Sequence, residues 1–124
     1  MSPLRIRREQ LADNSLVVVR GGELDSDSLR RDAVLTFRRF GEYGVSVLAV
    51  QDDAALDELA RSQLKRFEVL TLMTAGSIRA AGLELRPTFR RPHYTVVFRD
   101  LESDLIRLRL CDNERRQNSY FSEG

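Results

Sequence analysis

Short apolar runs alternate with amphipathic stretches along the first two thirds of the chain. The runs are rich in β-branched residues and are followed by glycine or polar residues, a pattern typical of buried strands. The stretches between them repeat apolar positions three or four residues apart, which indicates helices. The pattern predicts three strand–helix units, with strands at 16–20, 45–50 and 67–73.

Capping residues mark the ends of the predicted helices. Short polar side chains are favoured at a helix N-terminus because their oxygens accept hydrogen bonds from unpaired backbone N–H groups. The candidates for this position are, in chain order, Asp25 or Ser26, Asp52 or Asp53, and Thr74 or Ser77. Gly41 and Gly82 are placed to end the first and third helices, because glycine readily adopts the left-handed conformation found there.

The pattern changes after the third helix. Strands at 83–88 and 94–99 are separated by residues 89–92, a connection of hairpin length. Pro87 has no backbone N–H, so the first of these strands is expected at a sheet edge. A final helix is predicted over 101–110.

The order of elements predicts the fold class. The series βαβαβαββα favours an α/β domain with a mixed, at least partly parallel sheet, a C-terminal hairpin and a final helix, with α+β as the alternative. We expect a single compact domain over 16–111, a basic N-terminal extension over 1–15 and a polar, flexible tail over 112–124.

Composition agrees with a globular cytoplasmic protein. Hydrophobic residues make up 42% of the chain, yet no apolar run reaches the roughly 20 residues that a membrane helix needs. The amino-terminal sequence lacks the apolar stretch of a secretory signal. Cys111 is the only cysteine, which agrees with a reducing compartment. The sequence thus predicts a cytoplasmic location without membrane contact, and it indicates no cofactor.

The basic residues are almost all arginine. The net charge of +1 comes from 20 basic and 19 acidic residues, so a site for a polyanion must be a local patch. Lys65 is the only lysine, which fits a genome of high GC content as well as a choice of forked guanidinium groups for phosphate binding. Arg31 and Arg38 share one face of the first helix, and the acids nearby are typical of a solvated surface.

The predicted hairpin carries the only histidine. Arg86, Arg90 and Arg91 stand within eight residues of His93, and Tyr94 follows it. Guanidinium groups hold phosphates in bidentate hydrogen bonds, and imidazole moves protons near neutral pH. The set therefore predicts a surface for RNA or a nucleotide, with His93 and Tyr94 as catalytic candidates. The alternative is that the charges only protect an exposed sheet edge from aggregation.

The turns after the strands form a second candidate phosphate site. In parallel strand–helix units, ligands gather beyond the carboxyl ends of the strands. Arg20 stands before a glycine pair after the first strand, and Thr74, Gly76 and Ser77 follow the third strand. Neither turn has the spacing of a known phosphate loop, and ordinary turn and capping roles are the alternative.

Carboxylates in these turns raise the question of a metal. The acids that would share this end of the sheet are Glu23, Asp25, Asp27, Asp52 and Asp53. Oxygen ligands of this kind suit Mg²⁺, but acids are also what helix N-termini favour electrostatically. We predict no metal site, and we interpret Cys111 as a packing residue.

Four segments carry a resemblance to a family. They are LVVVRGGELDSDSLRRDA, FGEYGVSVLAV, LTLMTAGSIRAAGLELRPTF and RPHYTVVF, and together they span most of the chain from Leu16 to Phe98. They resemble a family of short proteins from high-GC bacteria with no assigned activity. The resemblance implies no reaction, cofactor or site residue. Small proteins of this kind often come from two-gene modules, such as a toxin with its antitoxin.

Two functional hypotheses follow from the sequence. The first is a small binding domain that recognises a protein partner or forms a homodimer through the edge strand at 83–88 or the final helix, with a local Arg/His patch for phosphate groups. The alternative is a metal-independent, RNA-directed toxin-like enzyme that uses Arg90, Arg91 and His93. It requires these side chains to converge on one exposed face. The binding domain is favoured, because the chain lacks a complete catalytic constellation.

Overall fold

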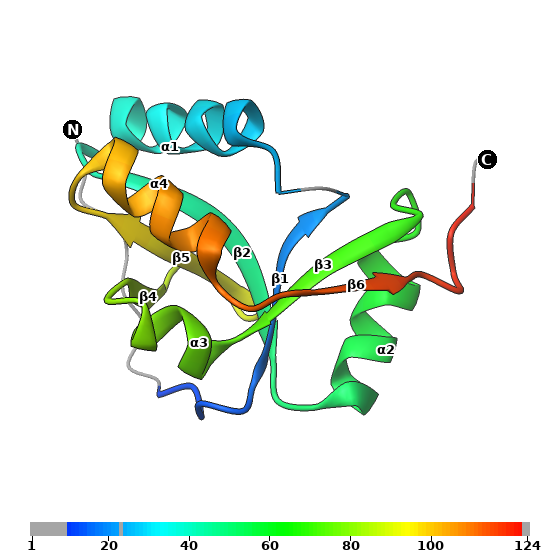
Figure 1. Cartoon of the computed structure of the whole chain (residues 1–124). Coiled ribbons are helices and arrows are strands. Elements are labelled where there is room, and N and C mark those ends of the chain that lie inside the picture. Colours follow the sequence, from blue (N-terminus) through cyan, green and yellow to red (C-terminus); the bar gives the residue numbers. More distant parts are fainter. Residues whose placement is uncertain (1–9, 23, 123–124) are drawn as a thin grey trace.

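The structure follows the predicted order of strands and helices and adds one strand near the C-terminal end. The computed structural model describes residues 10–22 and 24–122 (Figure 1). In chain order its elements are β1 (Leu16–Gly21), α1 (Ser26–Phe40), β2 (Tyr43–Val50), α2 (Asp53–Gln63), β3 (Val69–Thr74), α3 (Ala75–Ala80), β4 (Glu84–Pro87), β5 (His93–Phe98), α4 (Leu101–Leu110) and β6 (Glu114–Gln117). Within the described ranges, no helix combines the length and the apolar character needed to cross a lipid bilayer.

The strands form one six-stranded sheet in the order β4-β5-β2-β1-β3-β6. All neighbouring pairs are antiparallel, so the fold is the α+β alternative, and the predicted parallel pairing is wrong. The repeated strand–helix pattern still has a physical basis. β2 and β3 run in the same direction and are joined through α2, but β1 lies between them and pairs with both. Hydrophobic periodicity cannot reveal such an intervening strand.

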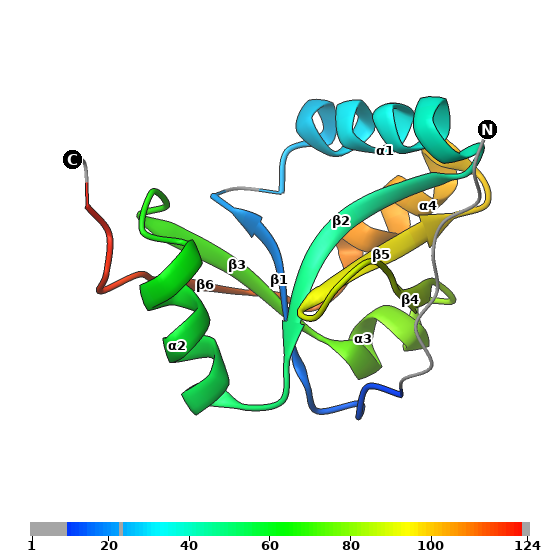
Figure 2. The same ribbon diagram turned by 180° about the vertical axis from the view of Figure 1, so that it is seen from behind.

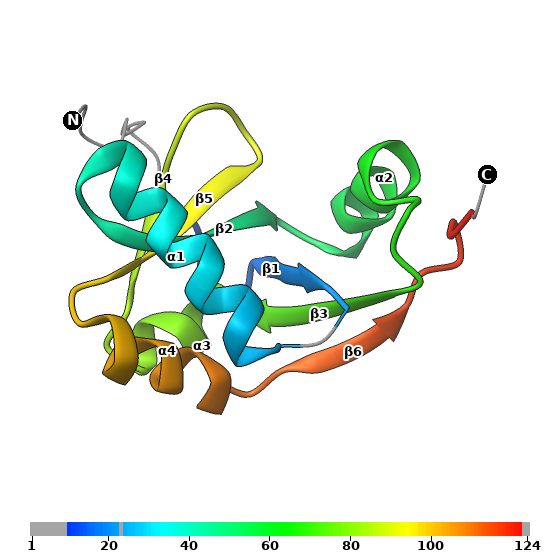
Figure 3. The same ribbon diagram turned by 90° about the horizontal axis from the view of Figure 1, so that it is seen from above.

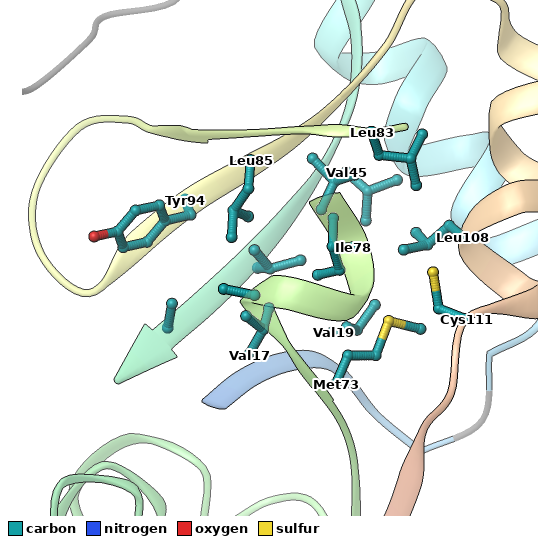
Figure 4. Packing of buried hydrophobic residues seen from close by; sticks show 14 of the residues in the cluster. Val17, Val19, Val45, Met73, Ile78, Leu83, Leu85, Tyr94, Leu108 and Cys111 are labelled. Carbon is teal, nitrogen blue, oxygen red and sulfur yellow. The ribbon is translucent and has the colours of Figure 1, made fainter. Parts of the chain in front are cut away.

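Side-chain alternation gives the sheet two apolar faces. One face packs against α1, α3 and α4, and Figure 4 shows Ile78 of α3 among Val17, Val45 and Leu108. The opposite face packs against α2. This second cluster consists of Val18, Leu56, Leu59, Ala60, Leu64, Leu70 and Leu72. Helices on both faces hold the sheet, because each buried aliphatic side chain stabilises the fold by roughly 1.5–3 kcal/mol.

The two central strands diverge. β1 and β2 pair at only three positions, from Leu16 with Val50 to Val18 with Leu48. Beyond them the strands open into a V that is visible from both sides in Figures 1 and 2, and α1 lies across its open end (Figure 3). Asp32 of α1 accepts a hydrogen bond from the backbone N–H of Ser46 at 3.1 Å, so the helix replaces a strand partner for this part of β2.

The predicted N-caps and the hairpin are confirmed. The N-caps of the first three helices are Asp25, Asp52 and Thr74, and Gly41 ends α1 with φ of 81°. The C-cap of α3 is Ala81, and the predicted Gly82 follows it with φ of 82°. β4 and β5 form the hairpin, and β4, which contains Pro87, is an edge strand.

The described part of the predicted tail, residues 112–122, contains a strand and a buried side chain, contrary to the predicted flexibility. Residues 114–117 form β6 on β3, and Asn118 is buried with 6% of its surface exposed. The strand was hidden because all of its side chains are polar, which is common on exposed sheet edges. In the predicted N-terminal extension, residues 1–9 lie outside the described part, while Gly76 donates to the carbonyl oxygen of Asp13 at 2.8 Å.

Candidate functional site

The opening between β1 and β2 forms a cleft of about 440 Å³ on the α2 side of the sheet. Its lining comes from β1, α1, β2, the start of β5 and the loop between α2 and β3. The lining residues are Val18, Val19, Gly21, Ser28, Arg31, Asp32, Leu35, Ser46, Val47, Leu48, Leu64, Arg66, Phe67 and His93. Most of this surface is apolar, and polar groups stand around it. Clefts of this size and character commonly bind small ligands.

Two arginines stand on different walls of the cleft. Arg31 comes from α1 and Arg66 from the loop before β3, and both are exposed. Neither forms an ion pair with a residue that the structure describes, whereas Arg30, Arg79 and Arg116 each pair with a carboxylate. The guanidinium of Arg66 instead lies 4.8 Å from the ring centre of Phe67. Within the described part of the chain, the hydrogen-bond donors of these two guanidinium groups are therefore not used by a carboxylate.

His93 is held by the buried Thr88, which is bonded in turn to the buried Thr95. Its Nδ1 lies 2.8 Å from Thr88 Oγ1, which lies 2.9 Å from Thr95 Oγ1. Thr88 and Thr95 are 0% and 2% exposed, while the imidazole is partly exposed in the cleft. The ring of Phe89 packs edge-on against the imidazole with 4.9 Å between ring centres. These contacts fix the orientation of the ring.

Phe67 is seated on Gly21. A Cβ at position 21 would lie 2.6 Å from Cδ2 of Phe67 and closer still to its Cγ. Gly22 has φ of 106°, but Gly21 does not have a positive φ, so Gly21 is required for space rather than for backbone conformation. The absent side chain lets the aromatic ring reach the cleft.

Arg86 does not join His93. It lies between Glu42 and Glu84, with Nη1 at 2.8 Å from Glu42 and Nε at 2.8 Å from Glu84. The hydrogen bond to Glu84 is the main cause that raises the pKa of Arg86 above its usual range, and it lowers the pKa of Glu84. The donors that were predicted to bind phosphate are thus used within the fold.

Replacing Arg86 by Met is expected to lower the free energy of unfolding at pH 7 by about 1–2 kcal/mol, because two carboxylates lose charged hydrogen bonds. The pKa of Glu84 is lowered in the folded protein. Its contribution is therefore present above the unfolded pKa of about 4.3 and is lost as pH falls through the lower folded value. Urea denaturation at pH 7 and below pH 4 should show a shallower acid loss in the variant. Arg61→Met, which removes an exposed pair with Glu58, should change the free energy of unfolding much less than Arg86→Met, because solvent screens the exposed charges.

The other hairpin candidates point to different places. Arg90 is exposed at the hairpin tip, and Arg91 lines a separate cavity beside residues 10–15. Tyr94 is 1% exposed and belongs to the core. The structure brings His93 together with Arg31 and Arg66 rather than with the hairpin arginines.

The turn at the start of α3 is filled by the chain itself. Thr74 Oγ1 accepts from Ser77 N at 3.1 Å and lies 2.7 Å from Ser77 Oγ. A Cβ on Gly76 would lie 3.1 Å from the carbonyl oxygen of Asp13. These residues cap and pack a helix of one and a half turns, and they leave no cradle for phosphate. The side chain of Arg20, the remaining candidate, lies outside the described part.

The acids in the turns also have local roles. Asp25 and Asp52 accept from backbone N–H groups at 3.0 and 2.9 Å, and Asp53 pairs with Arg116. No cluster of three or more potential metal ligands occurs among the described residues, and Glu23 is not one of them. Cys111 is buried, and burial raises the pKa of its thiol. This agrees with a packing role.

The sequence interpretation missed Arg31 and Arg66. Arg31 was assigned to a solvated helix surface, and the loop that carries Arg66 gave no signal. Arg31 joins the site only because α1 crosses the open end of the V.

A search of protein-family models gives no match for this chain, and searches of curated proteins and of solved structures give no significant match either.

Proposed function

We propose that this chain is a small binding domain whose cleft between β1 and β2 holds single-stranded RNA. The observation that carries the proposal is the pair of arginines, Arg31 and Arg66, which face one apolar cleft from different walls and have no carboxylate partner among the described residues. Guanidinium groups placed in this way are suited to adjacent phosphates.

The aromatic residues around the cleft favour a single strand. Phe67 lines the cleft, and Phe89, which is 40% exposed, packs against His93, another residue of the lining. Bases of a single strand stack on such rings, each contributing about 1–3 kcal/mol. Asp32 also lines the cleft, but its Oδ2 accepts the N–H of Ser46, and the facing arginines outnumber it.

The binding proposal is tested with a fluorescently labelled RNA of ten nucleotides and anisotropy at two salt concentrations. Arg31→Ala and Arg66→Ala should each weaken binding about tenfold, and each should reduce the slope of log affinity against log salt by about 0.7. Arg99→Ala is the matched control, because Arg99 is also exposed but does not line the cleft.

Equal losses in all three arginine variants would mean that only the general charge attracts RNA. No measurable binding by the wild-type chain would overturn the proposal outright. Circular dichroism of each variant confirms that the comparison is made between folded proteins.

A second function, RNA cleavage, is favoured by one observation, the hydrogen bond between His93 Nδ1 and the buried Thr88. When Nδ1–H donates to Thr88, Nε2 carries the lone pair that a general base needs. His93 would take the proton of a 2′-hydroxyl, whose oxygen attacks the adjacent phosphorus. The 5′-oxygen would leave with a proton from water, giving a 2′,3′-cyclic phosphate and a 5′-hydroxyl.

If cleavage occurs, mass spectrometry of incubated RNA should find ends with a 2′,3′-cyclic phosphate. His93→Gln should slow their formation at least about 100-fold, the usual share of a general base. The same sequence as DNA, which lacks the 2′-hydroxyl, should bind without being cut. Intact RNA after incubation with a chain that binds it would exclude cleavage and leave the binding proposal standing.

A further inference from the structure

A second cavity of about 540 Å³ adjoins the cleft. It is lined by Gly21, Gly22, Arg66, Phe67, Glu68, Val69, Arg115, Gln117 and Phe121. Three of these residues, Gly21, Arg66 and Phe67, also line the cleft. The two spaces therefore meet at the edge of the sheet where the Phe67 ring rests on Gly21.

The second cavity lies on the other face of the sheet. Gln117 is paired with Val69, and Arg115 is paired with Thr71, so these side chains share one face. Leu70 and Leu72 alternate with them and belong to the α2 face, as do Val18 and Leu64 of the cleft. A ligand that occupies both the cleft and the second cavity therefore passes Arg66 and Phe67 at the edge of the sheet.

The polar groups of the second cavity differ from those of the cleft. Arg31 and Arg66 of the cleft pair with no carboxylate among the described residues, whereas the second cavity shares Arg66 and adds the exposed acid Glu68 and the amide of Gln117. A carboxylate repels phosphate but accepts hydrogen bonds from the exocyclic amino group of cytosine, and a glutamine side chain can bond adenine at N6 and N7. Arg115 and the partly exposed Phe121 complete the wall.

We propose that the second cavity is a nucleobase subsite for the same RNA strand whose phosphates lie in the cleft, and that it prefers bases with an exocyclic amino group. This inference rests on the proposed function. Phe67 and Phe121 would contact the base, Glu68 and Gln117 would hydrogen-bond its edge, and Arg66 at the shared edge would bind the phosphate between the two spaces. The strand then spans at least two nucleotides.

The test is a competition series with unlabelled A, C and U homo-oligomers of one to four nucleotides against the labelled decanucleotide. Affinity should rise at least tenfold from one to three nucleotides, and C₃ and A₃ should bind at least fivefold more tightly than U₃. The double variant Glu68→Ala/Gln117→Ala should remove the base preference, so that C₃, A₃ and U₃ compete equally with the labelled decanucleotide. Arg31→Ala should weaken all three trinucleotides equally.

The outcomes separate the two proposals. If no oligomer competes and the decanucleotide does not bind, the proposed function fails and the subsite fails with it. If the decanucleotide binds and Arg31→Ala weakens it, but C₃, A₃ and U₃ compete equally, only the base subsite is overturned. The base subsite is likewise overturned if the Glu68→Ala/Gln117→Ala variant still binds C₃ and A₃ more tightly than U₃.

Discussion

Replacing Asn118 by alanine is expected to lower the free energy of unfolding by about 2–4 kcal/mol and to weaken ligand binding in the cleft. Asn118 is 6% exposed, and its Nδ2 donates to the carbonyl oxygens of Leu64 and Phe67, both at 2.9 Å. Its Oδ1 accepts from Tyr120 N at 3.1 Å. The side chain thus holds both ends of the loop that carries Arg66.

Urea denaturation gives the change in stability, and RNA anisotropy below the unfolding transition gives the change in affinity. Asn113→Ala is the matched control, because Asn113 is exposed and makes one hydrogen bond, to the carbonyl oxygen of Cys111 at 3.0 Å. It should cost less than about 1 kcal/mol and leave affinity unchanged. An Asn118→Ala protein as stable as wild type would mean that the tail does not secure the loop.

Placing a methyl group at Gly21 is the second change with a large expected effect. Gly21→Ala should lower the free energy of unfolding by about 2–3 kcal/mol, because the new Cβ overlaps the Phe67 ring and must displace it. The displaced ring leaves the place where it lines both the cleft and the second cavity, so affinity for RNA should also fall. Urea denaturation and RNA anisotropy measure the two effects.

Gly22 and Phe67 supply the controls for Gly21. Gly22→Ala meets no atom within 4 Å but has φ of 106°, so it should cost about 1 kcal/mol of backbone strain and leave Phe67 in place. In the double variant Gly21→Ala/Phe67→Ala the overlap disappears. Its loss of stability should therefore be smaller than the sum of the two single losses. Strict additivity would show that the ring and the glycine are not in contact.

The features that follow from short segments could be predicted from the sequence. Asp25, Asp52 and Thr74 cap helices because their oxygens bond N–H groups two or three residues away. The hairpin of β4 and β5 needs only a turn of a few residues, and Pro87 restricts β4 to an edge. Such interactions depend on neighbouring residues, so the sequence pattern contains them.

The features that depend on distant segments could not be predicted. The antiparallel sheet results from β1 lying between β2 and β3, and no residue pattern within a strand identifies its neighbours. Arg31 and His93 lie 62 positions apart in the sequence and share a cleft because α1 crosses the V. Arg86 was placed in the site by its distance along the chain, but Glu42, 44 positions away, binds it instead. Chain proximity and spatial proximity differ most at such positions.

The narrow junction between β1 and β2 has a consequence for motion. The two halves of the sheet, β4-β5-β2 and β1-β3-β6, share a seam of three residue pairs, and α1, which bonds β2 through Asp32 and Ser46, lines the cleft between them. Small rotations of the two halves of the sheet about this seam would widen and narrow the cleft, while the strand pairing within each half stays intact. A strand of RNA that fills the cleft would restrict this relative motion. Backbone amides at the seam would therefore exchange hydrogen with water more slowly in the complex than in the unliganded domain.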